Sequence, residues 1–145
     1  MAIALLDVNV LVSLAWPTQQ SSYSVQTWFS KQVRAGWATT AVTQSGFIRT
    51  MLNPALGAHL SVSAVISLLE QSTTDPNHHC WSADCDVAEI LRPFSRHLRG
   101  YRQVTDAFLI GLAARHGGVL ATLDGGAAEL AKMAGFGHVV ELLIR

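Results

Sequence analysis

Short apolar runs of strand length alternate along this chain with longer segments in which apolar residues recur every three or four positions. Residues 3–6 have the pattern of a short buried strand, and four further short strands are predicted over residues 37–39, 79–81, 119–122 and 139–143. The segments between them predict helices over residues 21–35, 43–52, 61–72, 87–94, 105–116 and 127–133. Strands that alternate with helices form a mostly parallel sheet with helices on both faces. The alternation therefore predicts the α/β class, with three layers in the order helix, sheet, helix.

Hydroxyl side chains indicate where two of these helices begin. Thr43 is the predicted N-cap of the helix that ends near Leu52, and Thr105 is the predicted N-cap of the helix that ends at Gly117. The second of these helices carries an apolar stripe made of Phe108, Leu109, Leu112 and Ala113. Such a stripe predicts a helix that packs on the sheet through one face.

The size and composition of the chain fit one globular domain. A domain of 145 residues buries roughly 68–70% of the surface that its unfolded chain exposes. Half of the residues are hydrophobic and 14% are charged, which excludes the class of disordered proteins. No stretch approaches the roughly 18 consecutive apolar residues of a membrane-spanning helix, and the first residues lack a signal-peptide pattern. We therefore expect one domain over residues 1–145, located in the cytoplasm and without a membrane segment.

Three aspartates fall at one edge of the predicted sheet. Asp7 directly follows the first strand, and Asp124 follows the strand over residues 119–122. Ligands of parallel sheets bind outside the carboxyl ends of the strands, which meet at one edge. Asp106 lies in the first turn of the helix before that later strand, so the start of this helix is expected at the same edge. Each aspartate alone fits a helix cap or a turn, but independent caps have no reason to share one edge.

Carboxylates that cluster in this way point to a metal ion. Two unit charges about 4 Å apart repel each other by roughly 4 kcal/mol at an effective dielectric constant of about 20. A hard divalent cation, Mg²⁺ or alternatively Mn²⁺, removes that repulsion and prefers oxygen ligands. Such an ion also polarises a phosphate and lowers the pKa of a water molecule. The sequence therefore predicts metal-dependent phosphodiester hydrolysis, with Asp7, Asp106 and Asp124 as metal ligands and catalytic residues.

A group of arginines precedes Asp106 and raises the question of RNA binding. Its members are Arg92, Arg96, Arg99 and Arg102. Ten basic and ten acidic residues give a net charge of zero, which counts mildly against a nucleic-acid partner. The group fits either a solvated helical face or a local strip that binds RNA phosphates, and its position before Asp106 favours the strip. Arg49 is likewise open to two interpretations, an ion pair within the protein or a contact with RNA.

Four blocks, in order along the chain, resemble those of a known family. Residues 5–12 (LLDVNVLV) resemble the opening of PIN-domain nucleases of the VapC type, the toxins of bacterial toxin–antitoxin pairs. Residues 36–49 resemble the second block, and residues 104–110 and 121–124 resemble the third and fourth. The resemblance implies a PIN fold and Mg²⁺-dependent endoribonuclease activity. It also implies a homodimer that a cognate antitoxin protein neutralises.

The resemblance also assigns roles to individual residues. The residues that match the metal-site acids of the family are Asp7, Asp106 and Asp124. Asn9 and Thr105 match polar residues that support those acids. Gln44 stands where many relatives carry a glutamate, and its neutral amide supplies a hydrogen bond to the site but no charge. Two hypotheses therefore stay open: an RNA-cleaving toxin, and a PIN-like binding or regulatory module with weak or no turnover.

Bulky apolar residues in the first half of the chain have no single interpretation. They are Trp16, Trp28, Phe29 and Trp37, together with the segment over residues 52–69. They form part of the core, or they form a groove for an amphipathic helix of the antitoxin, or they form a dimer interface.

Overall fold

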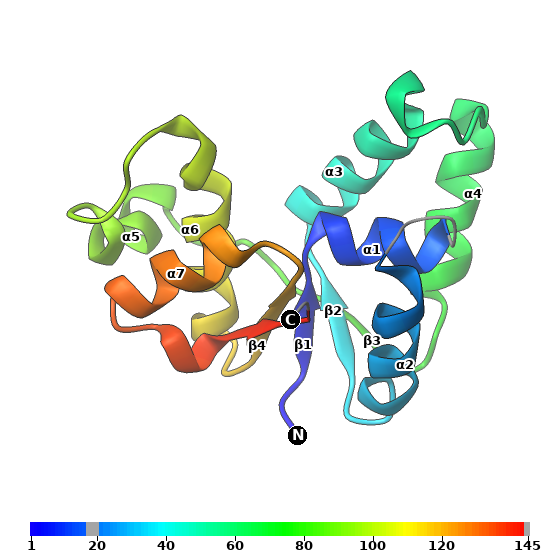
Figure 1. The fold of residues 1–145 in the computed structure, drawn as a ribbon. Coiled ribbons are helices and arrows are strands. Elements are labelled where there is room, and N and C mark those ends of the chain that lie inside the picture. The colour runs from blue at the N-terminus through cyan, green and yellow to red at the C-terminus, as the bar shows by residue number, and fades with distance from the viewer. Residues whose placement is uncertain (17–20, 144–145) are drawn as a thin grey trace.

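The computed structural model, which describes residues 1–16 and 21–143, is built on a five-stranded parallel sheet (Figure 1). Its strands are β1 (Ala4–Leu6), β2 (Trp37–Thr39), β3 (His78–Cys80), β4 (Val119–Thr122) and β5 (Val140–Leu142). Their order across the sheet is β3-β2-β1-β4-β5. The first strand is therefore the central one, and Leu5 of β1 lies between Ala38 of β2 and Leu120 of β4.

Helices cover both faces of this sheet. The α-helices of the described residues are α1 (Val8–Ala15), α2 (Ser22–Gln32), α3 (Ala41–Leu52), α4 (Val62–Thr73), α5 (Val87–Leu91), α6 (Val104–Arg115) and α7 (Gly125–Met133). Short 3-10 turns add η1 (Pro54–Leu56), η2 (Arg92–Phe94), η3 (Tyr101–Gln103) and η4 (Gly137–Val139). Figure 1 shows α1 to α4 on one face and α5 to α7 on the other. The predicted α/β class with three layers is confirmed. Among the described helices, none combines the length and the apolar character that crossing a membrane requires.

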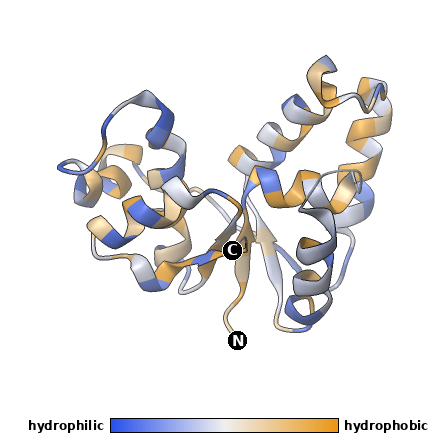
Figure 2. Ribbon diagram, viewed as in Figure 1, coloured by the Kyte–Doolittle hydropathy of each residue, from blue (hydrophilic) through white to orange (hydrophobic). Residues whose placement is uncertain are grey.

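Alternate residues of the strands enter two separate apolar cores. Leu5 and Leu120 belong to the core on the side of α5, α6 and α7. Leu6 and Ala121 belong to the core on the side of α1 to α4. Both faces of the central strand β1 are buried, and β1 is apolar throughout, as its orange colour in Figure 2 shows.

Helix α6 is buried on all sides, which the predicted single stripe did not anticipate. All seven residues from Ala107 to Ala113 are buried, those between the stripe positions included. The helix packs against the sheet, α5 and α7. Helix α5 comes so close that a Cβ atom on Gly111 would lie 2.5 Å from Ile90 Cγ2. A helix that is apolar around its circumference is typical of a protein interior.

Two helices begin at residues other than the predicted ones. Thr40, not Thr43, is the N-cap of α3, and the backbone N–H of Thr40 donates to Thr43 Oγ1 at 3.0 Å. Gln103 is the N-cap of α6, which continues directly from η3, so Thr105 lies inside the first turn. A hydroxyl group in the first turn also bonds to backbone groups near the helix start, so the residue type alone does not fix where a helix begins.

The helix predicted over residues 87–94 ends earlier than predicted, so the arginines that follow it do not lie on one helix. Helix α5 stops at Leu91 and continues as the 3-10 turn η2. Pro93 has no backbone N–H and cannot donate to the carbonyl group of Glu89, as a longer α-helix would require. The arginines from Arg92 to Arg102 therefore follow a series of turns, which corrects the interpretation as one helical face.

Candidate active site

Asp7, Asp106 and Asp124 line one cleft at the carboxyl ends of β1 and β4. Asp7 follows β1, Asp124 follows β4 after one intervening residue, and Asp106 lies in the first turn of α6. The cleft has a volume of about 400 Å³. The other residues that line it are Val8, Asn9, Val12, Ser13, Ser21, Thr50, Leu56 and Leu123. The structure thus brings together the three acids that the sequence predicted at one edge.

Asp7 is the most deeply buried of the three acids, with 8% of its surface exposed. It is the N-cap of α1, and its Oδ1 accepts from the backbone N–H of Val8 at 2.8 Å. Its Oδ2 accepts from Thr122 Oγ1 at 2.7 Å. Its own backbone N–H donates to the carbonyl oxygen of Ala121 at 3.0 Å, which ties the start of α1 to β4. Asp7 is therefore both a helix cap and a wall of the cleft.

Thr122 is a supporting residue that the sequence analysis missed. Its side chain is fully buried, and its Oγ1 donates to Asp7 and accepts from the backbone N–H of Asp124 at 3.1 Å. Asn9, which the sequence did predict, lies beside it: Asn9 Nδ2 donates to Thr122 Oγ1 at 3.5 Å, and Asn9 Oδ1 accepts from the backbone N–H of Leu123 at 3.2 Å. The available signal was a threonine two residues before an aspartate, a spacing that forms local turns through the hydroxyl group.

Asp106 and Asp124 have more open surroundings than Asp7. Asp124 is exposed and is the N-cap of α7, where its Oδ1 accepts from the backbone N–H of Gly126 at 2.8 Å. Asp106 is half-buried and does not cap a helix. The carboxylate of Asp106 accepts no hydrogen bond from the residues that the structure describes, so its oxygens are available to a ligand.

The cleft holds more acid than its surroundings neutralise. Burial raises the pKa of Asp106 from 3.8 to about 7, and the neighbouring charges of Asp7 and Asp124 contribute to the rise. Burial also raises the pKa of Asp7, although the hydrogen bonds from Thr122 and Val8 act in the opposite direction. No lysine, arginine or histidine is among the described residues that line the cleft. The described lining residues therefore supply no positive charge to balance the three acids, and a bound cation would supply it.

The donor atoms of the cleft fit a hard divalent cation. All three candidate ligands are carboxylates, which Mg²⁺ and Mn²⁺ prefer. Within residues 1–16 and 21–143, no three His, Cys, Asp or Glu side chains are already gathered closely enough to ligate one ion.

Gln44 and Thr105 lie outside the set of residues that line the cleft. Gln44 Nε2 donates to Thr39 Oγ1 at 2.9 Å, and the same oxygen is hydrogen-bonded to His78 Nε2 at 2.7 Å. Thr105 is exposed, and its hydroxyl group bonds to no residue in the described part of the chain. The supporting roles of Gln44 and Thr105 stay predictions.

The four predicted RNA-binding arginines are exposed but do not line the cleft. They are Arg92, Arg96, Arg99 and Arg102. Arg102 packs over the ring of Tyr101, 5.7 Å from its centroid, and Arg102 Nε donates to the Tyr101 hydroxyl group at 3.3 Å. In Figure 1 the segment between α5 and α6 lies at the end of the sheet where β1 enters α1. A role of these arginines in RNA binding stays a prediction.

Comparisons with known proteins agree with the fold and with the resemblance. The model of the PIN domain family matches residues 4–133. Three ribonucleases of Mycobacterium tuberculosis are each 36% identical to this chain. The match to ribonuclease VapC44 covers 83% of this chain and 85% of that relative. The match to ribonuclease VapC39 covers 88% of this chain and 93% of the relative, and the match to ribonuclease VapC38 covers 89% and 90%, in the same order.

A solved structure supports the fold alone. The structure of FitAB bound to an IR36 DNA fragment superposes with a TM-score of 0.62 over 97% of this chain and 95% of that chain, at 18% identity. It agrees with the three-layer architecture. This chain therefore belongs to the PIN-domain family, in the group that contains the VapC ribonucleases.

Proposed function

We propose that this protein is a metal-dependent endoribonuclease that hydrolyses RNA phosphodiester bonds, as the toxin of a toxin–antitoxin pair. The observation that carries the proposal is that Asp7, Asp106 and Asp124 line one cleft without a basic residue among the described lining residues. Relatives that are 36% identical over most of the chain bear the name ribonuclease. Mg²⁺ is the proposed cation, and Mn²⁺ is the alternative.

The three carboxylates have distinct parts in this proposal. When bound, the cation polarises the phosphate and lowers the pKa of the attacking water. Asp7 is held in orientation by Val8 and Thr122, and Asp124 is held by Gly126. Burial and the neighbouring acids raise the pKa of Asp106 to about 7, so this side chain would release a proton to solvent on ligating a cation near neutral pH. Two oriented ligands and one that exchanges its proton form the proposed catalytic group.

A cleavage assay on single-stranded RNA tests this function. We expect cleavage of a mixed RNA pool with Mg²⁺ or Mn²⁺ and none with a chelator. Asp7→Asn and Asp106→Asn are each expected to lower kcat by about 100-fold or more, because each removes a charged ligand of the cation that polarises the phosphate and activates the water. Asp86→Asn is the matched control, since Asp86 is an exposed aspartate at the start of α5, outside the cleft. Cleavage that persists unchanged in Asp7→Asn contradicts the proposal.

The same assay separates the enzyme from a PIN-like binding or regulatory module. That alternative depends on Gln44, which stands where many relatives carry an acid. Gln44 bonds to Thr39, away from the residues that line the cleft, so its neutral amide leaves the three-acid group complete. Absence of cleavage by the wild-type protein with both metals supports the module.

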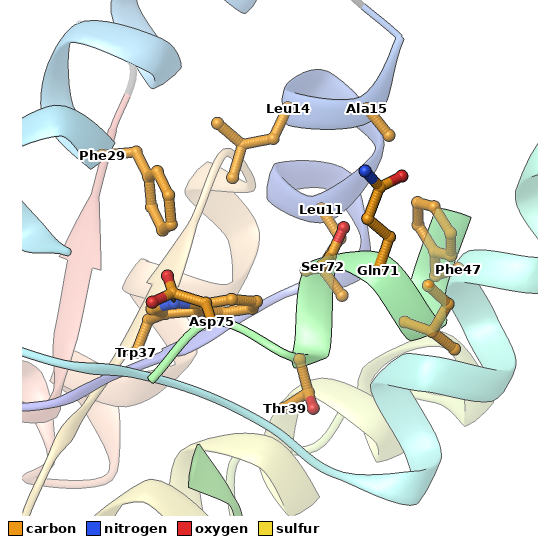
Figure 3. Close-up of a pocket in the computed structure, with 11 residues that line it drawn as sticks. Leu11, Leu14, Ala15, Phe29, Trp37, Thr39, Phe47, Gln71, Ser72 and Asp75 are labelled. Carbon is orange, nitrogen blue, oxygen red and sulfur yellow. Dashed lines mark hydrogen bonds between the residues drawn. The ribbon is translucent and has the colours of Figure 1, made fainter. Parts of the chain in front are cut away.

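A pocket on the other side of α1 supports the proposed antitoxin partner. The pocket has a volume of about 330 Å³ and is lined by residues from α1, α2, α3 and α4 and from β2 (Figure 3). Phe29 and Trp37 form part of its wall, and Trp37 Nε1 donates to Asp75 Oδ2 at the rim at 2.9 Å. Trp16, Trp28 and Phe29 are half-buried against the core, whereas Trp37 is buried. An apolar side chain of an antitoxin helix fits such a pocket.

The proposed homodimer draws on a different surface. Val62 and Ile66 are exposed apolar residues on α4, 55% and 42% accessible. They provide apolar area for a second copy of the chain. Analytical ultracentrifugation of the protein alone and with its antitoxin measures both assemblies.

A further inference from the structure

Arg49 is a cation without an acidic partner, located next to a cleft of acids. It is exposed on α3, one turn before the end of the helix. In the described part of the chain, the ion pair is Arg115 with Glu89, at 2.8 Å, and Arg49 forms none. Of the two interpretations of Arg49 that the sequence left open, an ion pair within the protein lacks support from the described residues.

Arg49 lies beside the contact between α3 and α1. The two helices approach so closely that a Cβ atom on Gly46 would lie 2.5 Å from Val8 Cγ2. The same point lies 3.7 Å from Arg49 Nη2. Val8 follows Asp7 and lines the cleft, and Thr50, the residue after Arg49, lines the cleft as well. The guanidinium group therefore lies beside the start of α1, close to residues that line the cleft, although Arg49 itself is not one of them.

The negative charge of the cleft suggests a role for the positively charged guanidinium group of Arg49 in binding RNA. Three carboxylates repel an RNA chain, and a metal ion compensates only where it binds. Arginine supplies a permanent positive charge and paired N–H donors that match the oxygens of a phosphate. We propose that Arg49 binds a backbone phosphate of the RNA strand beside the cleft, next to the phosphate that is cleaved.

This inference rests on the proposed ribonuclease function, and a binding experiment without turnover tests it. The probe is a fluorescently labelled single-stranded RNA, titrated at several salt concentrations with Asp106→Asn protein, which binds without cutting. Arg49→Gln in that background is expected to weaken binding about tenfold at low salt. It is also expected to reduce the slope of log K against log salt by about 0.7, which is the share of one neutralised phosphate on a single strand.

Two further variants separate charge from structure. Arg49→Lys keeps the charge and is expected to keep most of the salt slope. Arg34→Gln is the matched control, because Arg34 is an exposed arginine between α2 and β2, at the opposite edge of the sheet. We expect it to bind with the unchanged affinity and slope. In the protein that retains Asp106, Arg49→Gln is expected to raise KM more than it lowers kcat.

The possible outcomes distinguish this inference from the function on which it rests. If the wild-type protein neither binds nor cleaves RNA, the function is wrong and the role of Arg49 is wrong with it. If the wild-type protein cleaves RNA in a metal-dependent way, but Arg49→Gln keeps its affinity, KM and salt slope, only the assignment of Arg49 is overturned. Thermal unfolding of each variant checks that the exposed substitutions leave the fold intact.

Discussion

Asp106 is the residue that connects the charge of the cleft with the stability of the fold. It is half-buried, it accepts no hydrogen bond from the described residues, and two other carboxylates lie near it. Its pKa rises from 3.8 to about 7, so the folded protein holds a proton that the unfolded chain has already released. The charged form of this side chain is therefore a destabilising element of the metal-free protein.

We expect the free energy of unfolding of the metal-free protein to fall as the pH rises from about 4 to about 7. Between these values the folded state binds more protons than the unfolded state, which makes stability decrease with pH. Asp106→Asn removes this part of the decrease, and a smaller decrease remains because the pKa of Asp7 is also raised. Urea unfolding at a series of pH values, with a chelator present, measures the effect. Equal pH dependence in wild type, Asp106→Asn and the control Asp86→Asn would rule out this account of Asp106.

Single residues were predictable where their position in the chain decided their role. Asp7 and Asp124 follow strands, and strand ends in a parallel sheet share an edge, so their meeting was predictable. The role of Thr122 was not predictable, because threonine is an ordinary strand residue. Its role depends on the Asp7 oxygen that tertiary packing brings next to its hydroxyl group. Thr105 shows the reverse case, since its residue type suggested a cap but the chain enters α6 from a 3-10 turn.

At the scale of elements, the contact between α1 and α3 determines the shape of the cleft. Gly46 permits that contact, and Val8, whose branched side chain has few alternative rotamers, is its counterpart. Residues of both helices line the cleft, Val8 from α1 and Thr50 from α3 among them. A side chain at residue 46 would therefore separate two walls of the site.

Gly46→Ala is expected to lower the free energy of unfolding by about 1–3 kcal/mol, since the added methyl group overpacks the contact. This loss is expected even though alanine favours a helix over glycine. Gly125→Ala is the control, because a Cβ atom there meets nothing within 4 Å. Combining Gly46→Ala with Val8→Ala should restore part of the stability. Chemical denaturation measures all four proteins, and a stable Gly46→Ala single variant would contradict the close contact.

Among the elements, strands were easier to predict than helix ends. Most of the strands are short apolar runs, β3 with its two histidines being different, and all five appear within one or two residues of their predicted positions. Helix boundaries depend on backbone hydrogen bonds that the residue type does not specify, as at Thr40 and Pro93. The full burial of α6 depends on its neighbours α5 and α7, which a pattern within one segment cannot show.

At the scale of the whole molecule, the cleft depends on contacts between distant parts of the chain. Asp7 bonds to Thr122, 115 residues later, and Asn9 bonds to Leu123. The α/β class followed from the alternation of strands and helices, but the strand order did not, because the same alternation is compatible with several orders. The prediction of one domain over residues 1–145 stays a prediction.

Metal binding is expected to stabilise the whole fold, since the three acids come from separate regions. With Mg²⁺ at 100 times its Kd, the free energy of unfolding should rise by about 2.7 kcal/mol. Thermal unfolding with Mg²⁺, with Mn²⁺ and with a chelator measures the gain. Asp106→Asn should lose most of it, and Asp86→Asn should keep it. An unfolding temperature that is the same with Mg²⁺, with Mn²⁺ and with a chelator would count against the proposed metal site.

The central position of β1 has a consequence for the synthesis of the protein. The ribosome makes Asp7 and β1 well before the partner strand β4 and Asp124, which follow only after more than a hundred other residues. A nascent chain therefore carries an isolated acid and no assembled cleft through most of translation. The three acids can therefore line one cleft only after β4 and Asp124 have emerged.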